Sequence, residues 1–358
     1  MGNQKNHVDR STSLSSPELN ERRKADHIRI NIEEDVAFKH LTTGFEDYFF
    51  MHEALPDIDL IKVDTSSAIF GRSVSTPLLI SSMTGGTAEA RTINRILAKA
   101  AQEVGIAMGL GSMRAAIEDN ALEYTYEVRD LAPDIPLFAN LGAVQLNYGY
   151  GLAECQQAVD MIEADALILH FNALQEAVQP EGDGNFSGLL GKIEEICRNL
   201  PVPVIAKEVG WGFSESTARC FASVGVAAID VAGAGGTSWS QVEMYRAPTP
   251  RLARVAGAFI NWGIPTSASI RYCRRGAPGM PIIASGGIGN GIDVAKAIAL
   301  GAQLAGIAGD FLRAADKDGV AGVVELAETI TDELRVAMFA SGAADIDALA
   351  QTALHTVY

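Results

Sequence analysis

Short apolar runs recur along the chain after residue 77, and polar or glycine residues follow each run. Their length is that of buried strands, and longer stretches with helical periodicity, such as 88–104 and 291–300, separate most of them. Strands that alternate with helices predict βα units around a parallel sheet. The runs lie at 78–82, 106–110, 137–139, 166–169, 204–206, 228–231, 282–284 and 304–307.

Eight such units in a chain of 358 residues favour a closed (β/α)8 barrel over an open doubly wound sheet. No G-x-G-x-x-G motif follows the first run, which weakens the open-sheet alternative further. We therefore predict an α/β protein with a TIM-barrel fold over residues 78–358.

Three segments fall outside the regular repeat. Residues 1–20 are polar and lack the apolar core of a secretion signal, so we expect a disordered tail. Residues 21–77 precede the first strand and are expected to form an extension that packs on the barrel and wraps or caps its bottom. Residues 239–280 make a long connection between the sixth and seventh strands, which is typical of a lid or a substrate wall.

Charge and cysteine usage narrow the range of partners and compartments. The net charge of −16, from 28 basic and 44 acidic residues, argues against nucleic acid but not against a small anionic ligand. The four cysteines form no C-x-x-C pair, which favours reduced thiols in a cytoplasmic protein. No apolar run reaches membrane-spanning length, so we expect no membrane partner.

The loops after the strands of a (β/α)8 barrel share one face, so polar residues at the strand ends should converge there. These residues, from the first strand to the eighth, are Ser81, Ser82, Met83, Thr84, Ser112, Arg114, Asn140, His170, Asn172, Gln175, Glu176, Lys207, Thr237, Gly286, Gly287, Ala308 and Gly309.

Glycine-rich loops after the last two strands favour a phosphate site, although glycines that only permit tight turns are the alternative. A flat cofactor over the barrel mouth would use the remaining polar groups. Lys207 at its edge would stabilise the negative charge of a reduced flavin. The alternative for Lys207 is an ion pair inside the barrel with Glu208 or Asp230.

His170 and Glu176 each have a plain alternative. After His170 the only histidine is His355, so the barrel lacks a His-rich metal site and His170 can be a satisfied core residue. A flavin-linked α-hydroxy acid oxidase would need a base near the seventh strand, usually a histidine, and none is there. Glu176 suits Mg²⁺ when ligand phosphates supply further oxygens, or it is simply an acid at a helix N-terminus.

A basic cluster, Arg22 to His27, stands out in this acidic chain. Composition alone favours a solvated surface run. The functional alternative is a clamp on a polyanionic ligand at a subunit contact.

These motifs together resemble type 2 isopentenyl diphosphate isomerase, in order and spacing, from about Arg22 to beyond Leu312. The matching segments are 23–27, 81–86, 111–114, 170–176, Lys207 and 285–287. The resemblance implies a (β/α)8 flavoprotein that interconverts isopentenyl diphosphate and dimethylallyl diphosphate with FMN, Mg²⁺ and NADPH. It also implies a homo-oligomer, either a tetramer or an octamer.

The resemblance also implies roles for individual residues. Diphosphate contacts would come from Arg23, Lys24 and Arg114, with Ser112 also binding the substrate and Glu176 on Mg²⁺. His170, Asn172 and Gln175 would surround the substrate as the candidate catalytic residues. Gln175 would orient the alkene or relay a proton, and orientation is favoured because a neutral amide is a poor acid. FMN contacts would come from Ser81, Ser82, Met83, Thr84, Ser112, Asn140, Lys207, Thr237, Gly286, Gly287, Ala308 and Gly309. One departure is Asp310, an acid beside the expected phosphate site where the family often has other residues.

Two other functions compete with the isomerase. Another FMN barrel oxidoreductase acting on a small acid would show net flavin reduction by its substrate. A non-catalytic phosphate- or flavin-binding protein would have no need for Gln175 and Glu176 beside a lysine.

Overall fold

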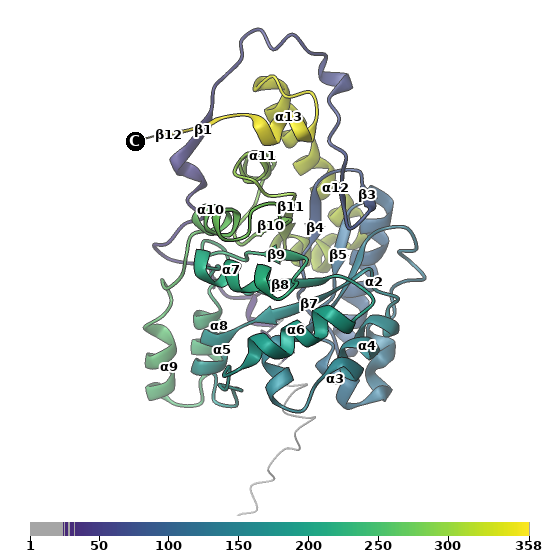
Figure 1. Cartoon of the computed structure of the whole chain (residues 1–358), viewed down its shortest axis with the longest axis vertical. Helices are drawn as coiled ribbons and strands as arrows, with labels where there is room; N and C mark the ends of the chain where they lie inside the picture. Colours follow the sequence, from purple (N-terminus) through teal and green to yellow (C-terminus); the bar gives the residue numbers. More distant parts are fainter. Residues whose placement is uncertain (1–23, 25, 28, 32, 358) are drawn as a thin grey trace, which may run out of the picture.

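Eight parallel strands form a closed barrel at the centre of the molecule (Figure 1). The structure is a computed structural model, and it describes residues 24–357 except 25, 28 and 32. The predicted (β/α)8 fold is confirmed, and each predicted apolar run overlaps one strand of the barrel. The strands are β4 (Leu78–Ile80), β5 (Ala107–Gly109), β6 (Leu137–Gly142), β7 (Ala166–Phe171), β8 (Val204–Glu208), β9 (Ala228–Asp230), β10 (Ile282–Ser285) and β11 (Leu304–Ile307).

Helices surround the strands (Figure 1). They are α2 (Ala88–Val104), α3 (Arg114–Glu118), α4 (Leu152–Met161), α5 (Ala173–Val178), α6 (Leu189–Asn199), α7 (Glu215–Ser223), α10 (Thr266–Gly276), α11 (Gly291–Ala299), α12 (Gly309–Ala340) and α13 (Ile346–Gln351). Short 3₁₀ helices lie at η1 (Phe45–Asp47), η2 (Leu60–Lys62), η3 (Asn120–Thr125) and η4 (Ala143–Asn147). No helix in the described part of the chain is both long enough and apolar enough to cross a membrane.

The sequence of α2 accounts for its bounds. The Thr87 hydroxyl caps its first turn by accepting a hydrogen bond from the Ala90 amide. Ile93 and Leu97 are buried on the face that packs toward the barrel. Gly105 ends the helix at a φ of 72°, a conformation that glycine adopts without steric cost.

Alternation along the strands separates two cores. In β8, Ile205 belongs to the cluster inside the barrel, whereas Val204 and Ala206 belong to the cluster beneath the helices. Successive side chains of a strand point to opposite faces, so Lys207 shares the inward face of Ile205. This places a cation near the barrel axis at the carboxyl end of the strand.

The extension before the barrel contacts both of its ends. The hairpin β2 (Ser67–Ile69) and β3 (Arg72–Val74) closes the bottom, where Ile69 and Val74 join the inner cluster. Earlier in the extension, β1 (Tyr48–Phe50) pairs with β12 (Leu354–Thr356). Within the extension, the expected position at the bottom of the barrel therefore applies only to the hairpin.

The first described residues of the extension lie at the opposite end of the barrel. The Phe38 amide donates to the Gly236 carbonyl at 3.0 Å, and the Ser238 amide donates to the Val36 carbonyl at 2.8 Å. Both partners belong to the loop after β9, so this segment crosses the barrel mouth. A bottom position is therefore wrong for this part of the extension, because its backbone hydrogen bonds are made with a strand-end loop.

The long connection between β9 and β10 is mostly helical. It contains α8 (Trp239–Arg246) and α9 (Pro250–Gly257) before α10. Pro250 occupies the first helical position of α9 and the Thr249 hydroxyl caps it, as the preferences of both residue types predict. Trp239 of α8 lines the cavity at the barrel mouth, so this connection supplies a wall of the cavity.

Candidate active site

A cavity of about 750 Å³ opens at the carboxyl ends of the barrel strands. Its size is that of a cofactor or small-molecule site. Every site residue predicted from the sequence lines it, except Arg23, which lies outside the described residues. The structure therefore brings these residues together, while the role of each stays a prediction. They are Lys24, Ser81, Ser82, Met83, Thr84, Ser112, Arg114, Asn140, His170, Asn172, Gln175, Glu176, Lys207, Thr237, Gly286, Gly287, Ala308 and Gly309.

Glycines build one end of the cavity because no side chain fits there. Gly286 has a φ of 104°, and a Cβ on it would lie 2.1 Å from the Gly233 carbonyl oxygen. Gly287 has a φ of 72°, and a Cβ would lie 2.6 Å from the Gly235 carbonyl. The loops after β9 and β10 can approach this closely only with glycine. The first turn of α12, which begins at Gly309, lines the same end, and this combination fits a phosphate group.

Lys207 is held by a buried carboxylate. Its Nζ lies 3.2 Å from Oδ2 of Asp230, which is fully buried, and the Ser285 hydroxyl donates to the other oxygen of Asp230 at 2.5 Å. The ion pair considered as an alternative is therefore present, yet Lys207 also lines the cavity. The Glu208 carboxylate does not pair with it and instead accepts from the backbone amides of residues 209–211.

Burial and hydrogen bonding act on Glu208 in opposite directions. Burial raises its pKa to about 7, and the three backbone donors oppose that shift.

Buried polar atoms at the cavity wall point to a polar ligand. The hydroxyl oxygens of Ser81 and Ser82 and the side-chain oxygen Oδ1 of Asn172 have no hydrogen-bond partner among the described residues. Buried polar groups are nearly always satisfied in folded proteins. Because all three residues line the cavity, donors and acceptors of a bound ligand would complete their hydrogen bonding.

Asn140 holds His170 in place across neighbouring strands. Its amide nitrogen donates to the Leu110 carbonyl at 3.0 Å, which leaves Oδ1 as the acceptor for Nδ1 of His170 at 2.7 Å. His170 therefore carries a proton on Nδ1 in this contact. The opposite ring nitrogen is Nε2.

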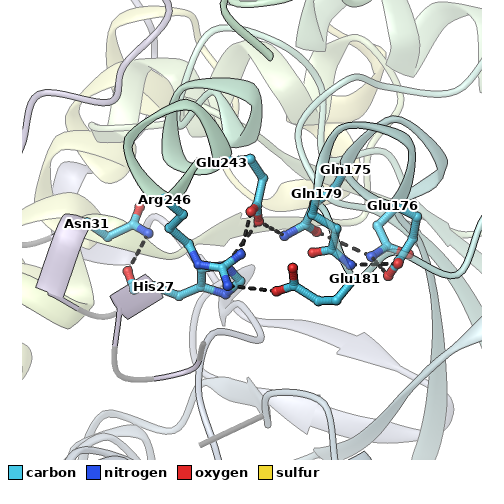
Figure 2. A network of polar contacts seen from close by, with 9 residues as sticks. His27, Asn31, Gln175, Glu176, Gln179, Glu181, Glu243 and Arg246 are labelled. Carbon is cyan, nitrogen blue, oxygen red and sulfur yellow. Dashed lines mark hydrogen bonds and ion pairs between the residues drawn. The ribbon is translucent and has the colours of Figure 1, made fainter. Parts of the chain in front are cut away.

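A network around Glu243 fixes the amide of Gln175 (Figure 2). Gln175 Nε2 donates to Glu243 Oε1 at 2.9 Å, and His27 Nε2 lies 3.0 Å from the same oxygen. The other oxygen of Glu243 is 2.5 Å from Nη1 of Arg246. Figure 2 shows Gln175 and Glu176 on one side of Glu243, with His27 and Arg246 on the other. Gln175 is thus oriented by a buried carboxylate and not by solvent.

Electrostatics keep Glu243 ionised. Burial alone would raise its pKa, but the hydrogen bond with His27 and the positive charges of His27 and Arg246 lower it to about 2. A carboxylate that is charged at neutral pH accepts hydrogen bonds and donates none. Glu243 therefore holds the amide nitrogen of Gln175 toward itself.

Glu176 lies beside this network and accepts from three donors. Asn172 Nδ2 contacts Oε1 at 2.7 Å, while Gln179 Nε2 and the Asp183 amide contact Oε2, each at 2.6 Å. No group of three or more His, Cys, Asp or Glu placed to hold a metal occurs between residues 24 and 357, wherever the chain is described. A cation here would use Glu176 Oε1, the unsatisfied Asn172 Oδ1 and ligand oxygens, which is a donor set that Mg²⁺ accepts.

Two cations reach the cavity from its rim. Lys24 Nζ donates to the Tyr126 hydroxyl at 3.0 Å, and that hydroxyl donates to the Ser112 carbonyl at 2.6 Å. Arg114 is held by Glu118 at 2.7 Å and by Asp183 at 2.9 Å. The Tyr126 hydroxyl therefore anchors Lys24 at the cavity edge, and the carboxylates of Glu118 and Asp183 anchor Arg114.

Known proteins resemble this chain over nearly its whole length. Residues 18–126 and 169–356 match the FMN-dependent dehydrogenase family. An isopentenyl-diphosphate delta-isomerase from Nostoc sp. is 53% identical over 91% of this chain and 93% of its own. Another from Synechocystis sp. is 54% identical over 93% and 95%. The chain belongs to the isopentenyl-diphosphate delta-isomerase family.

The fold of this isopentenyl-diphosphate delta-isomerase family member is shared more widely. A mandelate oxidase solved with an FMN adduct superimposes with a TM-score of 0.62 over 95% of this chain and 96% of that one. The two sequences are 17% identical, so the likeness concerns the fold alone.

Sequence reasoning missed several residues that organise the site of this isomerase-family chain. Glu243 and Arg246 lie on α8, away from any strand end, and carry no local motif. Tyr126 follows a 3₁₀ helix and looks like an ordinary core aromatic. His27 belongs to the basic cluster of residues 22–27, a pattern that does not reveal its contact with Glu243. The length of the 239–280 connection indicates a wall of the cavity, but it does not indicate that Glu243 accepts a hydrogen bond from Gln175.

Proposed function

We propose that the protein interconverts isopentenyl diphosphate and dimethylallyl diphosphate through an allylic 1,3-proton shift, with FMN as its cofactor. The observation that carries this proposal is identity above 50% to isopentenyl-diphosphate delta-isomerases over more than 90% of the chain. The cavity supports it with a glycine-built phosphate cradle at one end and the cations Lys24 and Arg114 at its rim.

The reaction adds a proton at one carbon and removes one from another, without net redox change. Protonation of an unactivated alkene needs a strong acid, and the described residues that line the cavity offer amides, hydroxyls, carboxylates, cationic side chains and two histidines. Reduced FMN, when bound, supplies the proton donor and acceptor, and NADPH serves only to bring it to the reduced state. The residues of the chain bind, orient and shield the reacting groups.

The residues that would hold FMN divide by chemistry. Gly286, Gly287 and the start of α12 suit the phosphate through backbone amides. Lys207 supplies positive charge near the barrel axis, where it would favour an anionic reduced flavin. The remaining contacts would come from Ser81, Ser82, Met83, Thr84, Ser112, Asn140 and Thr237, all of which line the cavity.

The substrate would lie at the rim side of the cavity. Lys24, Arg114 and Arg23 suit the diphosphate, with Ser112, His170 and Asn172 nearby. Gln175 would orient the alkene, since its amide is fixed by Glu243. Binding energy from the diphosphate would then position the reacting carbons.

The Tyr126→Phe substitution tests whether the Tyr126 hydroxyl anchors Lys24 at the diphosphate site. The Tyr126 ring is fully buried, and burial raises the pKa of its hydroxyl, which therefore stays protonated. The Tyr126→Phe variant loses one hydrogen bond to Lys24 and one to Ser112. We expect the KM for isopentenyl diphosphate to rise about fivefold, the equivalent of about 1 kcal/mol, with little change in kcat.

The matched control for this variant is Tyr124→Phe, because Tyr124 is 43% exposed and packs against Arg91. Steady-state kinetics of both variants give the comparison. An unchanged KM for Tyr126→Phe would show that the Tyr126 hydroxyl does not position Lys24 for the diphosphate, since Lys24 also donates to the Ser112 carbonyl at 3.3 Å.

Glutamine at position 176 tests the proposed Mg²⁺ ligand. The Glu176→Gln variant loses a negative charge and turns an NH₂ group toward one of its present donors. We expect the Mg²⁺ concentration for half-maximal activity to rise at least about tenfold, because a neutral amide is a weaker ligand for a hard cation. Glu325→Gln on the exposed side of α12 is the control. An unchanged Mg²⁺ requirement would end the metal role of Glu176.

A flavin spectrum combined with a proton-exchange assay tests the function itself. Purified protein is expected to be yellow, to bleach with NADPH in the absence of oxygen, and to exchange protons of isopentenyl diphosphate when reduced. Net flavin reduction by a small hydroxy acid would favour the oxidoreductase instead. Flavin binding without any exchange would favour a non-catalytic binder.

Two broader properties belong to the same proposal. We expect a homo-oligomer, a tetramer or an octamer, located in the cytoplasm. Light scattering of the purified protein gives its mass directly, and a monomer would contradict the expected assembly.

A further inference from the structure

An acidic side chain stands inside the proposed phosphate cradle. Asp310 is the second residue of α12 and lines the same end of the cavity as Gly286 and Gly287. Its Oδ2 lies 3.9 Å from the position that a Cβ on Gly289 would occupy, so the carboxylate faces the glycine loop after β10. This anion therefore lines the same cavity as the backbone amides that suit a phosphate.

Arg313 compensates this charge. Its guanidinium forms an ion pair with Asp310 one turn earlier on the helix, and both side chains line the cavity. Nη1 of Arg313 also lies 3.2 Å from the position of a Cβ on Gly309, the first residue of α12. The cation therefore lies against the helix start, within the proposed cradle.

A phosphate entering this cradle meets both members of the pair. The Asp310 carboxylate repels the phosphate, and Arg313 interacts with two anions at once, the carboxylate and the phosphate. The side chains of Asp310 and Arg313 are 40% and 55% exposed, so solvent and salt weaken these interactions without removing them. Asp310 also gains from the positive end of the helix dipole, and a bound phosphate would compete with it for that gain.

We propose that Asp310 and Arg313 set how tightly this protein holds the FMN phosphate, with Asp310 weakening and Arg313 strengthening the attachment. The proposal rests on FMN being the cofactor. It makes FMN a readily exchanged ligand whose affinity falls with the charge of Asp310.

The test compares FMN with riboflavin, which has the same ring system but no phosphate. Flavin fluorescence titrations of the flavin-free protein give both dissociation constants, at low and at high salt. For Asp310→Asn we expect the FMN dissociation constant to fall about tenfold at low salt and by less at high salt. For Arg313→Gln we expect a rise of about tenfold. Riboflavin affinity should stay unchanged in both variants.

The matched control is the pair Asp332 and Arg335, which has the same spacing on α12 and lies outside the cavity. Asp332→Asn should leave FMN affinity unchanged. An Asp310→Asn variant that binds FMN no more tightly than the native protein would overturn the proposal, as would an equal shift for riboflavin. Native protein that binds neither flavin would instead contradict the proposed function itself.

Discussion

Replacing Gln175 with alanine is expected to lower kcat about 100-fold while changing the KM for isopentenyl diphosphate by less than about threefold. The Gln175 side chain is held by Glu243 at 2.9 Å and by Asn172 at 3.3 Å, so its orientation is set before substrate arrives. Loss of a pre-oriented group beside the reacting carbons affects the transition state more than the diphosphate contacts. Steady-state kinetics with reduced FMN and Mg²⁺ separate the two parameters.

A second variant identifies the source of this orientation. Glu243→Gln keeps the size of the side chain but removes the charge that accepts from Gln175, His27 and Arg246. We expect kcat to fall in the same direction as for Gln175→Ala, and by less. Gln351→Ala, an exposed glutamine at the end of α13, is the control. A rise in KM with unchanged kcat for Gln175→Ala would make Gln175 a substrate-binding residue only.

The Lys207→Met substitution is expected to lower both the unfolding free energy of the protein and the reduction potential of the bound flavin. Lys207 is 7% exposed and pairs with Asp230, which is fully buried, so its loss leaves an uncompensated charge in the barrel. Breaking such a pair costs about 3 kcal/mol of unfolding free energy. Loss of the cation should also lower the flavin reduction potential, on the order of 30 mV for each 1.4 kcal/mol of lost stabilisation. Chemical denaturation and a potentiometric titration measure the two effects.

The double variant Lys207→Met with Asp230→Asn separates stability from chemistry. The neutral amide keeps an oxygen for the Ser285 hydroxyl, which now donates to Asp230 at 2.5 Å. We expect unfolding free energy to recover by more than half, because no charge is left unpaired. The flavin potential should stay low. A potential that recovers together with stability would show that Lys207 acts on the fold alone.

The barrel and its strand ends could be predicted from sequence because their signals are local. Apolar runs marked all eight strands, and the helical periodicity of residues 88–104 matched the bounds of α2. Barrel topology then required the strand-end residues to meet, whatever their separation along the chain. For the same reason Lys207 could be assigned to the cavity and also to an ion pair, and both assignments hold.

The rest of the site depends on contacts between distant segments that leave no local pattern. Residue 36 reaches the loop after β9 through backbone hydrogen bonds, which any residue type can make. Glu243 meets Gln175 across 68 positions and His27 across 216. A buried glutamate on a helix resembles an ordinary surface acid until its neighbours are known. Tertiary structure was therefore needed to find the residues that orient Gln175.

The most direct test of the isomerase account uses protein from which FMN has been removed, as verified by loss of visible absorbance. The protein is incubated with isopentenyl diphosphate and Mg²⁺ in deuterated water under reducing conditions, with and without added FMN. We expect dimethylallyl diphosphate and deuterium incorporation only when reduced FMN is present, with no net flavin oxidation. Full isomerisation by the flavin-free protein would contradict it.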